Sequence, residues 1–232
     1  MFHSQKRSEF IEIMDQDGVA IKDIEFALHD IGKVNKYLGG YSVILNALEQ
    51  LNWQGENLSI LDVGSGGGDT LRAISDYAKN KKYNISLVGI DINPAMTNYA
   101  MAQSKTYSNV NFKTHNVFDD ALLENKFDVV MSNLFCHHFD KDELKKLLER
   151  MKMLSKSYVL VNDLHRHWFA YYSIKIITAI FSNSYMVKYD APLSVARSLT
   201  KNEWIEILNL AGIKNYKIKW LWAWRWQIII EK

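Results

Sequence analysis

From about residue 58 onward, short apolar runs alternate with longer segments in which apolar residues recur at helical spacing. Five of the runs have the length and the composition of buried strands. They are Leu58–Val63, Ile85–Asp91, Val110–Asn116, Phe127–Asn133 and Tyr158–Asp163. Strands that alternate with helices favour a parallel sheet with helices on both faces, so the pattern predicts a doubly wound α/β domain.

The helices between these runs begin at recognisable capping residues. The first, from about Thr70 to Lys79, follows the first run directly. Asn93 followed by Pro94 is a strong helix start, because asparagine caps free backbone N–H groups and proline suits the first helical position. The segments that open at Asp140 and Thr200 each carry a glutamate three residues later, which is the spacing of a capping box.

Three parts of the chain depart from this alternation. The final segment, NYKIKWLWAWRWQIIIEK, predicts two strands joined near Ala223 and therefore an antiparallel last strand. Residues 1–52 are helical in pattern, and residues from about 164 to 198 form an insertion far longer than an ordinary connection. We expect a helical lid over 1–52 and a main domain over 53–232 that contains a helical cap. Both can fold over the carboxyl ends of the strands, where open α/β sheets bind ligands.

Composition and charge say little about the partners and the cellular compartment of the protein. The 232 residues carry a net charge of +2, so charge gives no argument for a nucleic-acid partner. Cys136 is the only cysteine, which fits a reducing compartment. The N-terminal stretch lacks the apolar core of a signal peptide, and the longest apolar run, Trp168–Phe181, is too short to span a bilayer. We expect a cytoplasmic protein without a transmembrane segment, while peripheral membrane contact and the oligomeric state stay open.

The stretch ILDVGSGGGDTL, Ile60–Leu71, joins the first strand to its helix and contains four glycines. A glycine-rich turn at this place lets a ligand approach backbone N–H groups at a helix N-terminus. The dinucleotide-binding pattern would need glycine or alanine at position 69, and the lysine of a phosphate loop is absent. Instead, Asp62 and Asp69 bracket the turn. Two carboxylates repel a pyrophosphate but attract an ammonium or sulfonium group.

A carboxylate also ends the second predicted strand. Asp91 lies where it can accept hydrogen bonds from the hydroxyl groups of a ribose, which indicates a nucleoside ligand. Ile92 follows it and offers an apolar face to a base. Asn116 and the backbone N–H of Val117, after the third strand, can bond the edge of that base.

These stretches, with VGIDIN, HNVFDD and FDVVMSNLFCHHF, resemble the successive motifs of class I S-adenosylmethionine-dependent methyltransferases. The likeness is greatest to the small-molecule group that includes ubiquinone- and menaquinone-pathway methylases, and it extends from Leu58 to Lys232. It implies a seven-stranded sheet of order 3-2-1-4-5-7-6, S-adenosylmethionine as cofactor and S-adenosylhomocysteine as product. The cofactor-binding residues that it implies are Asp62, Gly64, Ser65, Gly66, Gly68, Asp69, Asp91, Ile92, Asn116, Val117 and Asn133. Position 116 departs from the family, which often has aspartate there.

Methyl transfer to an oxygen needs a group that takes the hydroxyl proton, and a positioned histidine is the usual one. His137 and His138 follow the fourth strand and His165 follows the fifth, so these three are the candidate bases, and the first two are preferred. No thiolate framework accompanies the histidines, so no metal site is expected. The expected acceptor-binding residues are Tyr41 in the lid and Arg166, Trp168, Tyr171 and Tyr172 in the cap.

The leading hypothesis is a methyltransferase that uses S-adenosylmethionine and acts on the oxygen of a small hydrophobic phenol or quinol, with or without a lipid tail. Methylation of carbon or nitrogen is the nearest alternative, and a catalytically inactive S-adenosylmethionine-binding protein is the second. An NAD-linked oxidoreductase is disfavoured by Asp69. RNA methylation would need a basic tract interleaved with aromatic residues, and the sequence has none.

Overall fold

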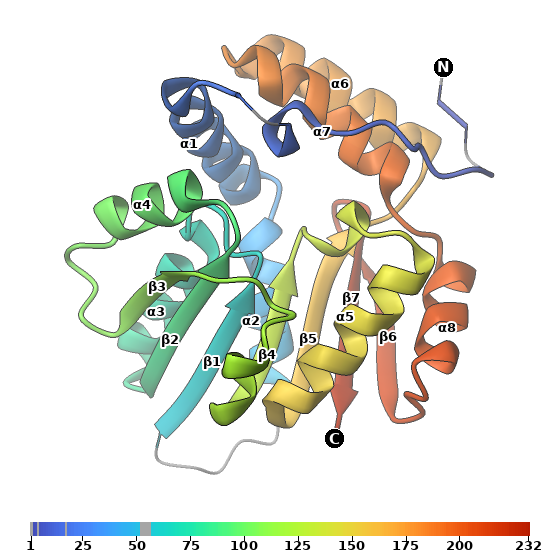
Figure 1. Ribbon diagram of the computed structural model, residues 1–232. Coiled ribbons are helices and arrows are strands. Elements are labelled where there is room, and N and C mark those ends of the chain that lie inside the picture. Colours follow the sequence, from blue (N-terminus) through green and yellow to red (C-terminus); the bar gives the residue numbers. More distant parts are fainter. Residues whose placement is uncertain (1, 4, 17, 52–56) are drawn as a thin grey trace.

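The computed structural model describes residues 2–3, 5–16, 18–51 and 57–232. The centre of the molecule is a seven-stranded sheet in the order β3-β2-β1-β4-β5-β7-β6, which confirms the predicted topology (Figure 1). The strands are β1 Asn57–Val63, β2 Asn84–Asp91, β3 Val110–Thr114, β4 Phe127–Asn133, β5 Ser155–Leu164, β6 Tyr216–Leu221 and β7 Arg225–Glu231. Strands β1 to β5 run parallel, and β7 is antiparallel to both β5 and β6.

Helices cover both faces of this sheet. In the described part of the chain the α-helices are α1 Ile21–Tyr37, α2 Gly40–Glu49, α3 Asp69–Lys81, α4 Pro94–Gln103, α5 Lys141–Leu154, α6 Trp168–Phe181, α7 Tyr185–Arg197 and α8 Lys201–Leu210. Short 3-10 turns are η1 Ile13–Asp15, η2 Asp120–Glu124 and η3 Cys136–His138. Helices α1, α6 and α7 form a separate layer above the carboxyl ends of the parallel strands, called the helical layer below (Figure 1).

The sheet is apolar on both faces, as a parallel sheet covered by helices should be. Leu61 of β1 belongs to the core cluster that includes α5 and α8, whereas its neighbour Ile60 belongs to the cluster that includes α2 and α3. Trp204 of α8 and Ile44 of α2 are fully buried in these two clusters. Burial on both sides fixes the strand register, because a slip of one residue would exchange the two faces.

The predicted helix starts are confirmed by their side chains. Asn93 Oδ1 accepts a hydrogen bond from the backbone N–H of Ala95 at 2.9 Å, and Pro94 is the first residue of α4. Both predicted capping boxes are complete, at Asp140 and at Thr200. Because α4 begins just after β2 ends, its cap also fixes the backbone at the carboxyl end of β2.

The N-terminal segment is less helical than its sequence pattern predicts. Apart from η1, the described residues before Ile21 form no helix. The carboxylate of Asp190 on α7 accepts hydrogen bonds from the backbone N–H groups of Ile13 at 2.7 Å and Met14 at 3.1 Å. These tertiary contacts take the place of helical hydrogen bonds, and the segment runs along α7 (Figure 1). The predicted boundary between residues 52 and 53 lies outside the described residues.

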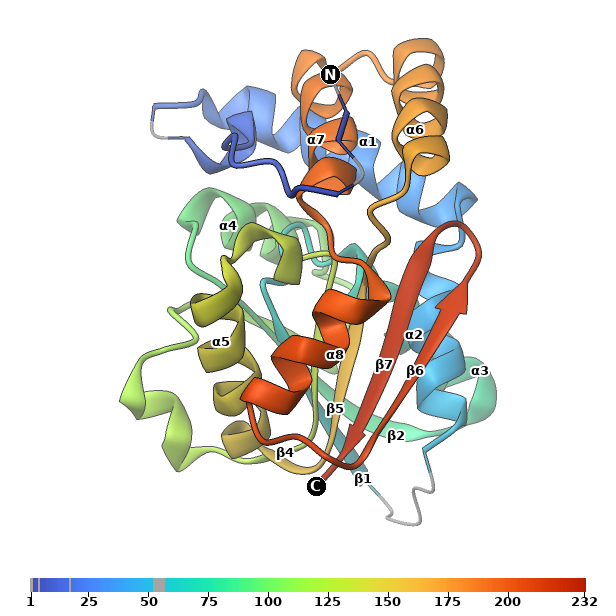
Figure 2. The same ribbon diagram turned by 90° about the vertical axis from the view of Figure 1, so that its right-hand side faces the viewer.

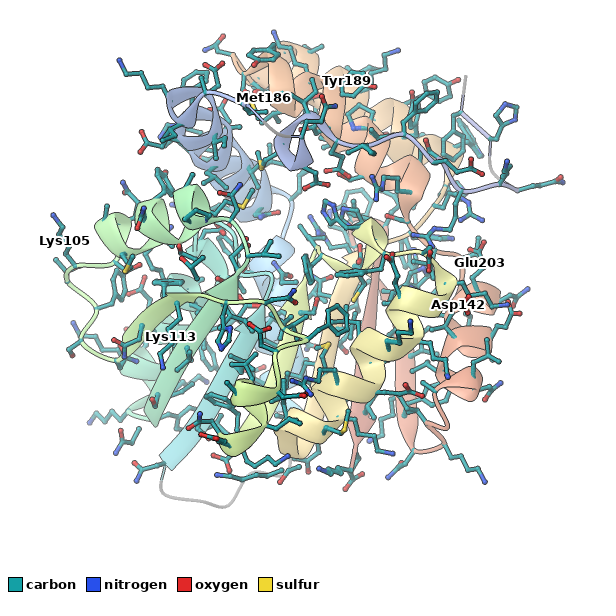
Figure 3. The ribbon with its side chains drawn as sticks, viewed as in Figure 1. Lys105, Lys113, Asp142, Met186, Tyr189 and Glu203 are labelled. Atoms are coloured by element: carbon teal, nitrogen blue, oxygen red, sulfur yellow. The ribbon has the colours of Figure 1, made fainter. Side chains whose placement is uncertain are left out.

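Buried polar contacts join the helical layer together. Asp30 of α1 accepts hydrogen bonds from the Ser182 hydroxyl at 2.7 Å and the Asn183 N–H at 3.1 Å, between α6 and α7. Met186 of α7 is buried against α1, whereas Tyr189 on the same helix is exposed (Figure 3). Within the described ranges, every helix is too short or too polar to cross a membrane.

Candidate functional site

A cavity of about 1070 Å³ lies between the carboxyl ends of the parallel strands and the helical layer. Its floor consists of residues at the ends of β1, β2 and β4 and in the loops that follow them. Its other walls come from the N-terminal segment, α1, α4, α6, α7 and the connection between β6 and β7. The predicted site residues that line it are Asp62, Gly64, Ser65, Gly66, Asp69, Asp91, Ile92, Asn133, His137 and His138.

The turn after β1 passes very close to two aromatic rings. Gly64 has a φ of 70°, and a Cβ placed on it would lie 2.3 Å from the ring of Phe135. Gly68 has a φ of 72°, and a Cβ there would lie 2.3 Å from the ring of Phe112. Both positions require glycine, for the left-handed backbone and for the space, so this turn is held in one shape at the start of α3.

Asp91 is fixed at the end of β2 by two backbone N–H groups. The N–H of Gly66 donates to Oδ2 and the N–H of Asn93 donates to Oδ1, each at 2.9 Å. Each carboxylate oxygen keeps a second lone pair, so Asp91 can accept further hydrogen bonds from a ligand. The neighbouring Ile92 is 68% exposed and lines the cavity, which gives a flat apolar group a surface to pack on.

Asp62 is the most unusual group on the cavity floor. It is buried at the end of β1, and among the described residues its Oδ1 atom has no hydrogen-bond partner. Burial, with the nearby carboxylates of Asp69 and Asp91, raises the pKa of Asp62 well above its ordinary value. A buried carboxyl group without a partner is costly, so this corner favours a ligand that brings a positive charge and hydrogen-bond donors.

Asp69, the first residue of α3, connects the glycine turn to the helical layer. Its Oδ2 lies 2.9 Å from the Tyr41 hydroxyl and 3.1 Å from Nδ2 of Asn35 on α1. Burial, together with the Asp69 carboxylate, raises the pKa of Tyr41, so this side chain remains a phenol that can donate a hydrogen bond. Tyr41 therefore supports the wall of the cavity from behind.

Asn133, at the end of β4, is held by a network of polar side chains. Its Nδ2 donates to the Thr70 hydroxyl at 2.9 Å. Its Oδ1 accepts a hydrogen bond from Asn162 of β5, and the same Asn162 amide donates to the carbonyl of Gly40 at 3.2 Å. This network links two strand ends to α2 and α3 and fixes the orientation of Asn133 at the cavity.

His137, in η3, is buried against Asp163, the last residue but one of β5. Its Nδ1 lies 2.7 Å from Oδ1 of Asp163, whose Oδ2 accepts the backbone N–H of His137 at 2.9 Å. Although burial alone would raise it, the pKa of Asp163 lies below its ordinary value because of the His137 ring. An ionised carboxylate can only accept, so Nδ1 carries the proton and the lone pair of neutral His137 is on Nε2. This is the orientation of a general base.

Glu12 of the N-terminal segment reaches the same part of the cavity. Its Oε1 lies 3.6 Å from Nε2 of His137 and accepts a hydrogen bond from the Ser194 hydroxyl of α7 at 2.9 Å. Burial raises the pKa of Glu12 from 4.5 to about 7.

His138 is more exposed than His137, and its Nδ1 lies 2.7 Å from Asp15. Two histidines are thus each oriented by a carboxylate.

Three of these side chains could also meet at a metal ion. The ligand atoms of Glu12, His137 and His138 all lie within 4.8 Å of one another. Histidines whose second ring nitrogen contacts a carboxylate are typical of metal ligands as well as of bases. The expectation that the chain has no metal site therefore stays a prediction that chelation can test.

The remaining predicted site residues are not part of the cavity wall: Tyr41, Gly68, Asn116, Val117, His165, Arg166, Trp168, Tyr171 and Tyr172. Asn116 Oδ1 accepts the backbone N–H of Phe118 at 3.0 Å, within its own loop. His165 packs on Trp226, with ring centroids 4.7 Å apart. Burial, with His167 and Arg166 nearby, lowers the pKa of His165 to about 4.

The predicted acceptor residues of the cap point elsewhere. Arg166 is buried and donates to the carboxylate of Glu203, at the start of α8 (Figure 3). Trp168 and Tyr172 are exposed on the outer side of α6, and Tyr171 packs against the N-terminal segment. The residues of α6 that line the cavity are Phe169, Ala170, Ser173, Ile174 and Ile177.

Sequence reasoning missed three carboxylates at the histidine end of the cavity. Asp163 is the last residue but one of β5, as Asp62 is of β1, and Asp91 is the last residue of β2, so the rule that singled out those two could have found it. Glu12 and Asp15 come from the N-terminal segment, whose path over α7 has no signal in the local sequence.

The central part of the chain has relatives among known proteins. Residues 60–157 match a family described as methyltransferase domain. The release factor glutamine methyltransferase of Fusobacterium nucleatum is 32% identical over 112 residues, which are 47% of this chain and 30% of that protein. A ubiquinone/menaquinone biosynthesis C-methyltransferase of Rickettsia typhi is 39% identical over 75 residues, which are 31% of this chain and 30% of that protein. The matched part of the chain thus spans less than a third of either relative.

Solved structures share the fold over nearly the whole chain. The plantazolicin methyltransferase in complex with SAH has a TM-score of 0.63 at 18% identity, over 91% of this chain and 97% of that one. Magnesium protoporphyrin IX methyltransferase from Synechocystis PCC 6803, with bound SAH, has a TM-score of 0.52 at 17% identity, over 94% of this chain and 90% of that one. At such low identity, these likenesses establish the fold alone.

Proposed function

We infer that this chain, which carries a methyltransferase domain on the class I fold, moves a methyl group from S-adenosylmethionine to a small hydrophobic acceptor. The observation that carries the proposal is Asp62, a buried carboxyl group whose Oδ1 has no partner in the described chain. The amino group of the methionine part would bring the charge and the donor that this carboxyl group lacks.

The rest of the cofactor has matching residues on the cavity floor. Asp91 would accept hydrogen bonds from the ribose hydroxyls, Ile92 would pack on the adenine, and Asn133 would lie beside the methionine end. Asn116 and Val117 stay predictions for the adenine edge. When bound, S-adenosylmethionine supplies a methyl group activated by its sulfonium centre. The chain contributes alignment and a helical layer that excludes water.

For the acceptor, we propose a phenol or quinol that reacts through its oxygen. Apolar side chains of the helical layer line the far half of the cavity, including Ile24, Leu28, Ile174, Ile177 and Val187. These side chains support a hydrophobic ring or tail. In the same half, Glu12 and His137 form a polar cluster, which supports a single hydroxyl group on that acceptor.

His137 would accept the hydroxyl proton at Nε2. Asp163 holds Nδ1–H and would stabilise the imidazolium that results, and the transferred proton stays on Nε2 until it exchanges with solvent. His138 is the second candidate, because it also lines the cavity and is oriented by Asp15.

Two alternatives keep some support. The Rickettsia typhi relative is named as a C-methyltransferase, and removal of a quinol proton would equally activate a ring carbon. A catalytically inactive S-adenosylmethionine-binding protein would need the same floor but would have no use for the pairing of His137 with Asp163.

Calorimetry with S-adenosylhomocysteine, followed by labelled S-adenosylmethionine and a panel of phenols and quinols with and without tails, tests the proposal. The methylated atom would be identified by NMR spectroscopy of the product. Failure to bind S-adenosylhomocysteine would sink the proposal. Binding without transfer to any member of the panel would favour the inactive binding protein.

A further inference from the structure

The outer side of α6 is apolar and exposed. Trp168, Tyr172, Ile176 and Ile180 recur every four residues, so they lie along one side of the helix. Ile176 and Ile180 are 60% and 67% exposed, and Phe181 at the end of the helix is 75% exposed. A row of large exposed apolar side chains along three turns of a helix marks an interaction site.

The exposed surface continues onto the tip of the β6–β7 hairpin. The ring of Phe169 lies 5.0 Å from that of Trp224, which lies 4.9 Å from that of Trp222. Trp222 is 65% exposed. Figure 2 shows α6 above the hairpin tip on the same side of the molecule. The outer side of α6 together with Trp222 is called the apolar platform below.

The exposed charged side chains on the two cap helices are basic. Helix α6 contains no acidic residue, and its one charged side chain is the exposed Lys175. Helix α7 adds the exposed Lys188, while its one carboxylate, Asp190, is buried and bonded to backbone N–H groups. This part of the surface therefore complements an anionic partner.

The apolar platform borders the mouth of the cavity. Phe169 and Trp222 are both exposed and both line the cavity. On the inner side of the same helix, Ile174 and Ile177 also line it. One helix thus has an apolar outer side and an apolar inner side, and the two meet where the cavity opens.

We propose that the apolar platform docks on the surface of an anionic phospholipid bilayer, with α6 lying in the plane of the interface. Tryptophan and tyrosine at one end of the stripe, aliphatic residues along it and lysines beside it are the composition of an interfacial helix. With 14 residues, α6 lies on a bilayer and does not span it. Docking would place the cavity mouth against lipid, so that a lipid-tailed acceptor enters directly; this consequence rests on the proposed function, whereas docking itself does not.

Flotation with vesicles of phosphatidylcholine, with and without phosphatidylglycerol, tests the proposal on the full chain. The wild-type chain should float with the anionic vesicles and bind neutral ones less. The double variant Ile176→Asp/Ile180→Asp should lose at least about tenfold in vesicle partitioning, because two charges would enter the interface. Lys175→Glu should weaken binding to anionic vesicles only. The matched control is Tyr83→Asp, an exposed aromatic residue beside β2 that is not on the platform.

Binding of S-adenosylhomocysteine, measured on each variant, reports whether the fold and the cofactor site are intact. Vesicle binding that is absent in the wild type, or equal in the double variant, would overturn the proposal. Light scattering that shows a dimer, dissociated by the same double variant, would assign the platform to self-association instead. Vesicle binding without any methyl transfer would support docking and count against the proposed function alone.

Discussion

The floor of the cavity is made by strand ends and one glycine turn, whereas the opposite wall is made by three helices and the extended segment that precedes them. On the floor, backbone N–H groups hold Asp91, and the turn has room only for glycine at positions 64 and 68. In the wall, buried carboxylates such as Asp30 and Asp190 join segments that are far apart in sequence. The floor is therefore shaped by the core of the fold, while the wall depends on side-chain contacts that another sequence could replace.

Substitution of the proposed base, His137 in the loop after β4, should give the largest effect, and that effect should be on methyl transfer rather than on cofactor binding. His137→Gln is expected to lower kcat by about 10²–10⁴-fold, the usual contribution of a general base. The affinity for S-adenosylhomocysteine should be unchanged, because the His137 ring contacts Asp163 and Glu12, neither of which is a proposed cofactor-binding residue. Single-turnover kinetics together with calorimetry would measure both quantities.

His138→Gln is the matched control, because His138 also lines the cavity and also contacts a carboxylate. It should change kcat by less than about threefold if His137 is the base. A larger loss in the His138 variant than in the His137 variant would reverse the assignment of the two roles.

Asp62→Asn, on the cavity floor, should weaken cofactor binding while it raises the stability of the free protein. Loss of one charge-assisted hydrogen bond, worth about 1.5–3 kcal/mol, should weaken S-adenosylmethionine and S-adenosylhomocysteine binding by about 10- to 100-fold. The free protein should become more stable, because a buried carboxyl group with a raised pKa is replaced by a neutral amide. Calorimetry and urea unfolding would report the two effects.

The control is Asp142→Asn, at an exposed position on α5 away from the cavity (Figure 3). It should leave binding unchanged and lower the free energy of unfolding by no more than about 1 kcal/mol, the value of a carboxylate in the first turn of a helix. If the Asp62→Asn variant binds the cofactor as tightly as the wild type, Asp62 does not hold the cofactor, and the proposed function loses its main support.

The floor of the cavity could largely be predicted from the sequence, whereas the wall could not. The helix starts and the residues of the floor follow from local patterns, because each strand end and its loop are contiguous in sequence, whereas the sheet order was implied by the family resemblance. Asp62, Asp91 and the glycine turn are examples. Asp163, near the end of β5, has a similar position, but it is buried behind the cavity and contacts His137.

The wall could not be predicted in the same way. A helix as apolar as α6 has two apolar sides, and periodicity alone does not tell which of them faces the cavity. The sequence therefore suggested Trp168 and Tyr172, whereas Ile174 and Ile177 line the cavity. Glu12 is held at the site by contacts with α7: the Ser194 hydroxyl binds Glu12 itself, and Asp190 binds the backbone of the following residues. No local pattern encodes these contacts across the chain.

Glu12 should make the stability of the protein depend on pH. Burial raises its pKa from 4.5 to about 7, so between these values the folded chain keeps a proton that the unfolded chain has released. Stability from this group is therefore highest at low pH, falls as the pH rises through the window and levels off above it. In Glu12→Gln this pH dependence of the free energy of unfolding should be absent. Between pH 4.5 and about 7, the free energy of unfolding of the wild type should therefore fall relative to that of the variant, by up to about 3 kcal/mol. Urea unfolding from pH 4.5 to 8 would measure it, and parallel curves for the two proteins would contradict the burial of an ionisable Glu12.

Chelation should have the smallest effect, and it decides whether His137 is a general base or a metal ligand. Neutral His137 cannot keep Nε2 free for a hydroxyl proton and also bind a cation with it, so a general base and a bound ion exclude each other at this atom. After dialysis against a chelator, the rate of methyl transfer should be unchanged within about twofold. Added Zn²⁺ should inhibit the reaction by binding to Glu12, His137 and His138. His137→Gln should abolish that inhibition, and metal analysis of the purified protein provides a readout independent of activity. If the chelator removes activity and a divalent ion restores it, Asp163 orients a metal ligand, and the proton is lost from an acceptor bound to the ion.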